Sequence, residues 1–324
     1  MKTLKVQFIP LLLLLPILTL AQTKDTTKVG IYITSIYDLS YDDNSFTVEY
    51  WMWRLNRNRQ FKEYNLIEDA NSKKIEKLFS STDWKDQSEN QLIQHAGDTL
   101  FWDYENFRST IKHNYDITNY PFDEEILNID LEATTYYDNW VKLQIDRKSS
   151  GRGDFDINGW NIGEMTIDST FSVYPTNFGG PGDTIKHVYT GLSIKIPIKR
   201  KGTALFFKLF SGLFVAFVIA LLSLRINIAE ADGRFGVCVG ALFAAIANMY
   251  IANSNLPMAS QFTFIDKAHI LTIFLILILF ATSTFSLQYY KDDQIEKSRK
   301  IDSIVIRSVI VVFILGMAII WPYK

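Results

Sequence analysis

The sequence predicts a β plus α membrane protein, in which an N-terminal β-sandwich outside the cytoplasm precedes a four-helix transmembrane domain. Three observations favour this fold class: residues 28–201 alternate apolar and polar positions between turn signals, residues 202–324 hold four long apolar segments, and residues 1–21 resemble an export signal. A chain of 324 residues also exceeds one typical domain. We therefore expect two domains after the signal.

The first 21 residues have the pattern of a secretory signal peptide. Two lysines near the start precede an apolar run at residues 8–20, and Ala21 is a suitable cleavage residue. A fifth membrane helix is the alternative, but the run is short for a bilayer and two prolines interrupt it. A signal peptide would place the following residues outside the cytoplasm.

The β-sandwich is predicted from alternation such as that at residues 31–33 and 46–50. Asp123 and Trp160 fall at strand boundaries, and for residues 73–80 a short helix is the alternative interpretation. The remaining expected strands cover residues 100–107, 109–112, 126–132, 140–146, 161–168, 171–174 and 187–198.

Four apolar segments are each long enough to cross a hydrocarbon core of about 30 Å as a helix. They cover residues 204–224, 235–252, 270–287 and 304–321. With the β-sandwich outside, four crossings return the C-terminus to the outside, although the basic residues 199–201 oppose this orientation. The internal loops would then carry Arg225, Arg234, Lys291, Lys297, Arg299 and Lys300, in agreement with the positive-inside tendency.

The second apolar segment differs from the others because it is rich in glycine and alanine and contains polar residues. Polar groups within a membrane are costly unless they face protein or water. We therefore expect this helix to line an aqueous path, which a ring of identical subunits could enclose. The polar positions are Asn248, Tyr250, Asn253 and Ser254.

Composition sets several function classes aside. A net charge of −2 without a basic stripe gives no indication of nucleic-acid binding. The single cysteine, Cys238, excludes an intrachain disulfide and a cysteine metal cluster. Four scattered histidines and the lack of a phosphate-binding glycine loop give no support for an enzyme, and no metal or cofactor is expected.

Residues 115–132 read YDITNYPFDEEILNIDLE, with the tetrapeptide at 120–123 between two alternating strands. This stretch resembles the signature loop of the pentameric ligand-gated (Cys-loop) channel family in its prokaryotic form, and the four apolar segments that follow are also similar to that family. The resemblance spans roughly residues 29–321. Two cysteines close this loop in animal members, and here those positions fall on His113 and Leu127. The loop would therefore be held by packing and hydrogen bonds.

The resemblance implies a homopentameric, ligand-gated channel of the bacterial inner membrane in which the second helix lines the pore. Asp232 would form a carboxylate ring that favours cations, with Glu230 as a second acid and Arg234 close enough to neutralise either. The alternative is that Asp232 only stabilises the helix N-terminus. Residues 255–257 resemble the family's motif at the outer end of the pore helix. Counted back from there in helical steps of three or four residues, the pore-facing residues would be Asp232, Gly236, Gly240, Phe243, Ala247, Tyr250 and Ser254.

Phe243 would form a ring of aromatic side chains where the family has its hydrophobic gate, which blocks ions by dewetting. The alternative is that Leu242 or Ile246 faces the pore. Gly236 and Gly240 depart from the hydroxyl residues common in the pores of this family.

Coupling between the two domains would involve the turn at residues 41–44, the signature loop and the connector at 255–266. Asp123 and Arg200 match the family's buried ion pair, although Asp123 could also simply cap a turn while Arg200 anchors at lipid headgroups. The implied coupling residues are Tyr120, Pro121, Phe122, Asp123, Arg200, Asn255, Leu256 and Pro257.

The family's agonist pocket lies between subunits and is lined by aromatic residues, which favour amines. Thr134 stands where amine-gated members carry tryptophan, so the aromatic box is incomplete, and ordinary core packing is the alternative for these residues. A small molecule or a proton would be the agonist. The competing function is a non-conducting membrane-anchored receptor of the same fold. The candidate ligand-binding residues are Trp51, Trp53, Tyr136, Tyr174 and Tyr189.

Overall fold

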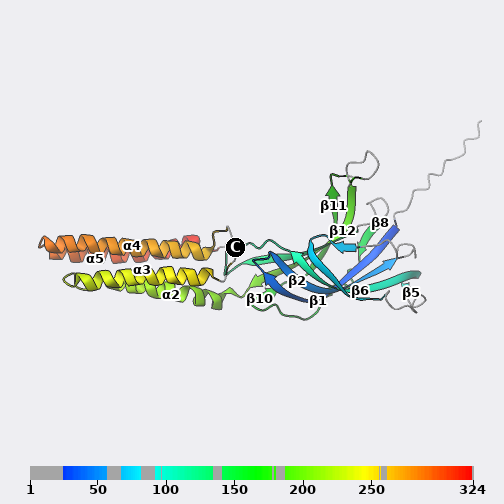
Figure 1. Ribbon diagram of the computed structural model, residues 1–324, viewed down its shortest axis with the longest axis horizontal. Helices are drawn as coiled ribbons and strands as arrows, with labels where there is room; N and C mark the ends of the chain where they lie inside the picture. The colour runs from blue at the N-terminus through cyan, green and yellow to red at the C-terminus, as the bar shows by residue number, and fades with distance from the viewer. Residues whose placement is uncertain are drawn as a thin grey trace, which may run out of the picture.

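The computed structural model describes residues 25–56, 67–81, 92–95, 97–133, 141–176, 179, 187–254, 256 and 261–322. The molecule is elongated, with a β domain at one end and, at the other, four helices that lie side by side along the long axis (Figure 1). This arrangement confirms the predicted fold class of a β domain followed by four apolar helices. The expected signal at residues 1–21 lies outside the described residues.

Twelve described strands form two sheets. In the larger sheet the order is β4-β6-β2-β1-β8, with β5 added to β6 and β9 added to β1. Its strands are β1 (Asp25–Ser40), β2 (Ser45–Asn56), β4 (Ser72–Ser80), β5 (Leu92–His95), β6 (Asp98–Lys112), β8 (Val141–Ile145) and β9 (Gly151–Arg152).

The smaller sheet has the order β10-β12-β7-β3, with β11 added to β12. Its strands are β3 (Ile67–Asp69), β7 (Glu124–Ala133), β10 (Trp160–Ile162), β11 (Thr166–Tyr174) and β12 (His187–Arg200). Because β7 and β12 are adjacent and antiparallel, the start of β7 lies beside the end of β12, with Lys199 opposite Glu124. This register brings the loop between β6 and β7, residues 113–123, next to the start of α2 at Gly202. We call this loop the signature loop.

The two sheets enclose the core of the β domain. Alternate residues of a strand point to one face, so Ile31 and Ile33 of β1 belong to the same buried cluster as Ile129 and Ile194 of the other sheet, and all four are fully buried or nearly so. Burying each such side chain contributes about 1.5–3 kcal/mol. The predicted alternation therefore corresponds to the real inner faces of both sheets.

Four expected elements are corrected by the structure. Residues 73–80 form no helix, because β4 pairs antiparallel with β6 and Ile75 lies opposite Ser109. Ile75 and Leu78 are exposed on this outer strand, so their spacing is not that of a buried helix face. The expected strands 100–107 and 109–112 are one strand, β6, and the expected strand 161–168 is divided between β10 and β11.

The described residues contain four helices that are long and apolar enough to cross a membrane. They are α2 (Gly202–Ser223), α3 (Ala231–Asn253), α4 (Phe264–Lys291) and α5 (Ile295–Ile320). The shortest, with 22 residues, spans about 33 Å at the usual rise per residue. The protein is therefore a multi-pass membrane protein.

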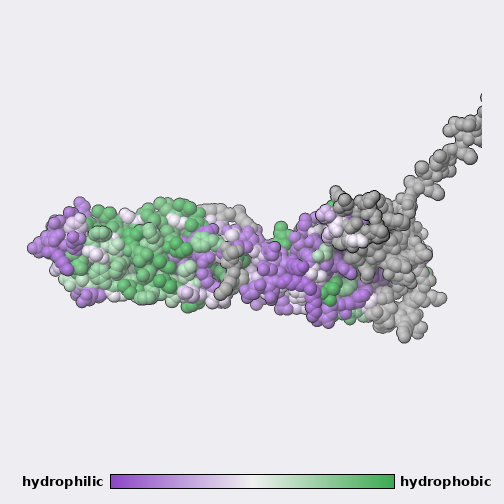
Figure 2. All heavy atoms as spheres, turned by 45° about the horizontal axis from the view of Figure 1, so that its top comes forward, coloured by the Kyte–Doolittle hydropathy of each residue, from purple (hydrophilic) through white to green (hydrophobic). Residues whose placement is uncertain are grey.

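Helix α4 begins six residues before its expected start because a capping box fixes it there. The Thr263 hydroxyl accepts the Asp266 amide at 3.2 Å, and the Asp266 carboxylate accepts the Thr263 amide at 3.0 Å. Apolar side chains cover the middle of the helical bundle, whereas its far end and the β domain are hydrophilic (Figure 2). This band matches the surface expected inside a bilayer.

Candidate coupling site and pore face

The signature loop between β6 and β7 contacts the end of the helical bundle that is nearest the β domain. The Phe122 ring lies 5.7 Å from Phe206 of α2, 6.3 Å from Phe264 of α4 and 5.2 Å from Trp321 after α5, measured between ring centroids. One side chain of the β domain therefore packs against residues from three helices. We call this pocket of three rings the Phe122 socket.

Backbone contacts fix the same loop to the bundle. The Phe264 amide donates to the Thr118 carbonyl at 2.9 Å, and the Gln261 side chain accepts the Ile117 amide at 2.9 Å. Gly202, the first residue of α2, lies under the Pro121 carbonyl, where an added Cβ would overlap the carbonyl oxygen. A glycine is thus required at this position for the close approach of loop and helix.

Asp123 and Arg200 form a bidentate ion pair at the point where β12 enters α2. The Arg200 Nε and Nη2 donate to the two Asp123 carboxylate oxygens at 2.6 and 3.0 Å, and the Arg200 amide donates to the Asp123 carbonyl at 3.1 Å. The Asp123 side chain is 0% exposed. Charge-assisted pairs of this geometry are among the stronger polar contacts in proteins.

Aromatic rings surround the Arg200 guanidinium. Its carbon lies 4.1 Å from the Trp160 ring centroid, 5.0 Å from that of Tyr120 and 5.5 Å from that of Tyr41. Burial lowers the pKa of Arg200 to about 10, so the group stays cationic at neutral pH. The Tyr41 hydroxyl donates to Asp123 at 3.3 Å, which joins the β1–β2 turn to the pair.

A second pair closes the base of the loop and was missed by sequence reasoning. His113 Nε2 lies 3.1 Å from one Glu125 carboxylate oxygen, and the Asp116 amide donates to the other at 2.8 Å. The resemblance compares His113 and Leu127 with the two cysteines of animal members, yet Leu127 is fully buried in the sandwich core. The available signal was Glu125, two positions before Leu127, because alternate residues of a strand point to the same face.

Helix α3 has one face buried in the bundle and one face exposed. Arg234, Cys238, Ala241, Ala245 and Ala252 are its buried residues. All seven residues expected to face a pore, from Asp232 to Ser254, are exposed in the single chain, with Phe243 at 67% and Tyr250 at 78%. A Cβ added at Gly236 or Gly240 would meet nothing within 4 Å. This exposed side, the α3 face, is thus left without a partner by the chain's own described residues.

The neighbours of this face are also informative. Leu242 is half-buried and packs against the bundle, whereas Ile246 is 37% exposed, so Phe243 is the most exposed of the three alternatives for the gate. Glu230 is exposed and directly precedes the first turn of α3, which contains Asp232. Both acids therefore lie at the end of the bundle far from the β domain.

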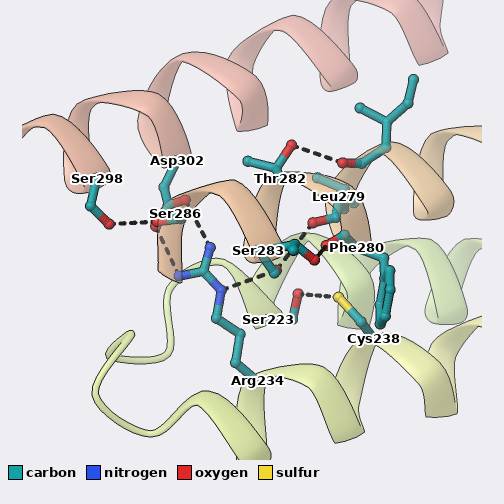
Figure 3. Close-up of polar contacts among 12 residues, drawn as sticks. Ser223, Arg234, Cys238, Leu279, Phe280, Thr282, Ser283, Ser286, Ser298 and Asp302 are labelled. Carbon is teal, nitrogen blue, oxygen red and sulfur yellow. Dashed lines mark hydrogen bonds and ion pairs between the residues drawn. The ribbon is translucent and has the colours of Figure 1, made fainter. Parts of the chain in front are cut away.

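Arg234 does not lie where the sequence placed it. Its side chain is fully buried and donates to the two Asp302 carboxylate oxygens of α5 at 2.8 and 3.0 Å, and its Nε donates to Ser283 of α4 at 3.1 Å (Figure 3). It is neither a loop charge nor a partner for Asp232. An unpaired buried charge is strongly penalised, so the chain supplies a carboxylate from a neighbouring helix.

Two of the four polar residues that indicated a water path face the bundle instead. The Asn248 side-chain oxygen lies 3.0 Å from His269 Nε2, and Asn253 donates to Asp266 at 3.0 Å. Only Tyr250 and Ser254 lie on the α3 face. Asn255 and Pro257 lie outside the described residues, and Leu256 packs against the bundle core.

The candidate ligand residues lie in two groups within one chain. Trp51 of β2 is 5.7 Å from Phe79 and 6.0 Å from Tyr104, and Trp53 donates to Asp146 at 3.2 Å. Both tryptophans belong to β2 of the larger sheet, and Trp53 also covers Gly30, where an added Cβ would overlap the indole.

The second group belongs to the smaller sheet. Tyr174 and Tyr189 meet edge to face at 5.5 Å, and the Tyr174 hydroxyl donates to Glu132 at 3.1 Å. The chain therefore does not bring the tryptophans and these tyrosines into one box by itself. Glu132 was not expected from the sequence, and Tyr136 lies outside the described residues.

The comparisons with known proteins do not assign a family. No protein-family model matches the sequence, and a search of curated proteins found no match.

Proposed function

We propose that this chain is the subunit of a homopentameric ligand-gated cation channel in a bacterial inner membrane, with the β domain and the C-terminus outside the cytoplasm. The observation that carries the proposal is the α3 face. It is exposed along the whole helix while the opposite side of α3 is buried in the bundle. A ring of subunits would turn five such faces toward a common axis.

The chemistry of the α3 face distinguishes it from a lipid-facing surface. From residue 310 to its end, the exposed residues of α5 are apolar and mostly large, such as Val311, Ile314 and Ile319. The α3 face instead carries an acid, two glycines and two hydroxyl-bearing residues, which hydrocarbon would not favour. Contact with other subunits and with water explains this composition better.

Two positions on the face would set conduction. Asp232 would form a ring of carboxylates that attracts cations and repels anions, and Arg234 does not oppose it because its charge is held by Asp302. Phe243 would form an apolar constriction that excludes water when closed.

The junction would transmit agonist binding to the helices. Arg200 links the last strand to α2, and Phe122 contacts three helices, so a movement of the β domain would move the bundle. The agonist would bind between subunits, with Tyr174, Tyr189 and Glu132 from one chain and the tryptophans of β2 from its neighbour. A small amine suits this set, since a carboxylate and aromatic faces both favour a cation.

The decisive experiment measures current through the purified protein in liposome patches under asymmetric salt. Phe243→Ser should give a steady leak that reverses near the cation potential, because a polar ring no longer excludes water. Adding Asp232→Asn should shift the reversal potential toward zero. Phe274→Ser is the matched control, since Phe274 of α4 is 60% exposed, close to the 67% of Phe243, and its variant should stay silent.

The ring itself is tested by cross-linking in a Cys238→Ala background. Cysteine at Ala247 should form disulfides between subunits on oxidation, whereas cysteine at Ile314 of α5, 60% exposed, should not. Cross-links at Ala247 together with silence of Phe243→Ser would favour a non-conducting receptor. Equal cross-linking at both positions would contradict the ring.

A further inference from the structure

A polar pocket lies at the end of the helical bundle that is far from the β domain. Its volume is about 530 Å³, and it is formed by residues 224–228 between α2 and α3, by Tyr290 of α4 and by the first turns of α5. Arg225 enters it from the first segment, and Ser298, Arg299 and Ser303 enter it from α5. Neither the channel pore nor the agonist site proposed above includes this pocket.

The charge inside the pocket is positive. Arg225 and Arg299 are both exposed, and neither forms an ion pair with a described residue. Asp302 is the acid that lines the pocket, but both of its oxygens accept hydrogen bonds from Arg234, whose own charge balances it. Two guanidinium groups with the Ser303 hydroxyl nearby form an arrangement suited to a phosphate, whereas the buried Ser298 hydroxyl is bonded to Ser286.

The surroundings of the pocket indicate where that phosphate comes from. Ile295, which lines the pocket, and Ile304 and Leu222, which are close in sequence to its lining residues, are 41%, 52% and 58% exposed. At this end of the bundle a hydrophilic surface adjoins the apolar band (Figure 2), so a ligand in the pocket would have its anionic group among the arginines and hydrocarbon beside it. Basic pockets between membrane helices are known to suit lipid headgroups.

We propose that this pocket binds the phosphate of an acidic phospholipid, which Arg225 and Arg299 hold while the acyl chains lie against α2 and α5. The binding does not depend on whether the protein conducts ions. Because Asp302 borders the pocket and also holds Arg234 of α3, an occupied pocket would stabilise the position of α3.

The test measures lipid binding by the full-length protein. The protein is released from bilayers that contain equal amounts of phosphatidylglycerol and phosphatidylcholine, and native mass spectrometry identifies the lipid that stays bound. The wild type should retain phosphatidylglycerol preferentially. Arg225→Gln with Arg299→Gln should bind it at least about tenfold more weakly, since each lost charged hydrogen bond weakens binding by that order. Lys291→Gln with Lys300→Gln removes the same charge from the same end outside the pocket and should bind normally.

Two further arms distinguish the alternatives. Ser303→Trp should fill the pocket and abolish retention while both arginines remain, which separates the site from general charge. Inorganic phosphate or glycerol phosphate at millimolar concentration should fail to displace the lipid, since they lack the hydrocarbon. The proposal is overturned by retention in the double arginine variant, by equal loss in the lysine control, or by displacement of the lipid by free phosphate.

Discussion

At the scale of single residues, Asp123 shows how burial determines the value of a charge. Its neighbour Glu124 pairs with Lys199 at 2.5 Å, but those two side chains are 35% and 66% exposed. Asp123 is 0% exposed and has the Arg200 guanidinium as its bidentate partner. Exposed pairs contribute about 0–1 kcal/mol, whereas breaking a buried pair costs about 3–5 kcal/mol.

We therefore expect Asp123→Ala to lower the free energy of unfolding by about 3 kcal/mol, because Arg200 is left buried without its counter-charge. Combining it with Arg200→Leu should restore part of the loss. Thermal unfolding in detergent, followed by tryptophan fluorescence, measures both. Glu124→Ala is the control and should change stability by less than about 1 kcal/mol. A loss in Asp123→Ala no larger than in this control would refute the assignment.

Asp69 gives a prediction about pH. It is buried in the β domain, where the Tyr50 hydroxyl donates to one oxygen at 2.7 Å and the Ser109 hydroxyl donates to the other. Burial raises the pKa of Asp69 above its ordinary value, so the native state holds the proton more tightly than the unfolded state. The resulting stability is fully present below the ordinary pKa of about 4 and is lost as pH rises through the raised value.

Asp69→Asn should remove this dependence, because the amide does not titrate. The unfolding temperature of the wild type, relative to that of the variant, should fall between pH 4 and pH 7.5. Asp154→Asn changes an exposed acid of the same domain and should leave the wild-type profile unchanged. A profile for Asp69→Asn parallel to that of the wild type would show that Asp69 keeps an ordinary pKa.

At the scale of elements, α3 shows why a membrane helix is hard to interpret from its sequence. Asp232 and Arg234 are two residues apart, so a helix directs them to different sides, one exposed and one inside the bundle. The same holds for Tyr250 and Asn248. Polar residues within such a helix therefore indicate either a water-facing side or a partner on a neighbouring helix, and spacing alone does not separate these cases.

The Arg234–Asp302 pair fastens α3 to α5, and Ser286 and Ser298 add a hydrogen bond of 2.5 Å between α4 and α5 at the same end (Figure 3). Asp302→Ala should lower the unfolding temperature of the bundle sharply, since it leaves Arg234 buried and unpaired. Asp302→Leu with Arg234→Leu should recover most of the loss, because two apolar residues carry no such penalty. Size-exclusion chromatography after heating reports the fraction that stays folded.

Asp232→Ala is the matched control for this prediction. Asp232 is an exposed acid in the first turn of α3, so its removal should cost no more than about 1 kcal/mol. If Asp302→Ala were as stable as Asp232→Ala, the buried pair would not hold the two helices together.

At the scale of the whole molecule, the sequence predicted the features that depend on periodicity and length. Alternation with a period of two located the sandwich, and apolar runs located all four helices, with α2 and α3 within about four residues of their expected bounds. Helix α4 begins six residues before its expected start because of its capping box, and α5 begins nine residues before its expected start, at Ile295, because its first two turns are mostly polar. The contact of Asp123 with Arg200 came from a resemblance, and the structure brings these residues together. Strand β4 was ambiguous because it is an outer strand with few buried side chains.

The missed contacts have one physical cause in common. Glu125 with His113, Glu132 with Tyr174, and Arg234 with Asp302 each join residues on different strands or helices. Their formation depends on strand register and helix rotation, which local patterns do not encode. Such partners become visible only when the elements are assembled.

The Phe122 socket has a consequence for how the protein is made in the cell. Its three rings belong to α2, to α4 and to Trp321 after α5, so the ribosome synthesises the β domain long before the last ring exists. Until α5 has entered the membrane, Phe122 has an incomplete site and stays partly exposed to water. Nascent chains halted before α5 should therefore present an apolar loop that chaperones and proteases recognise, and release from this surveillance would coincide with insertion of the final helix.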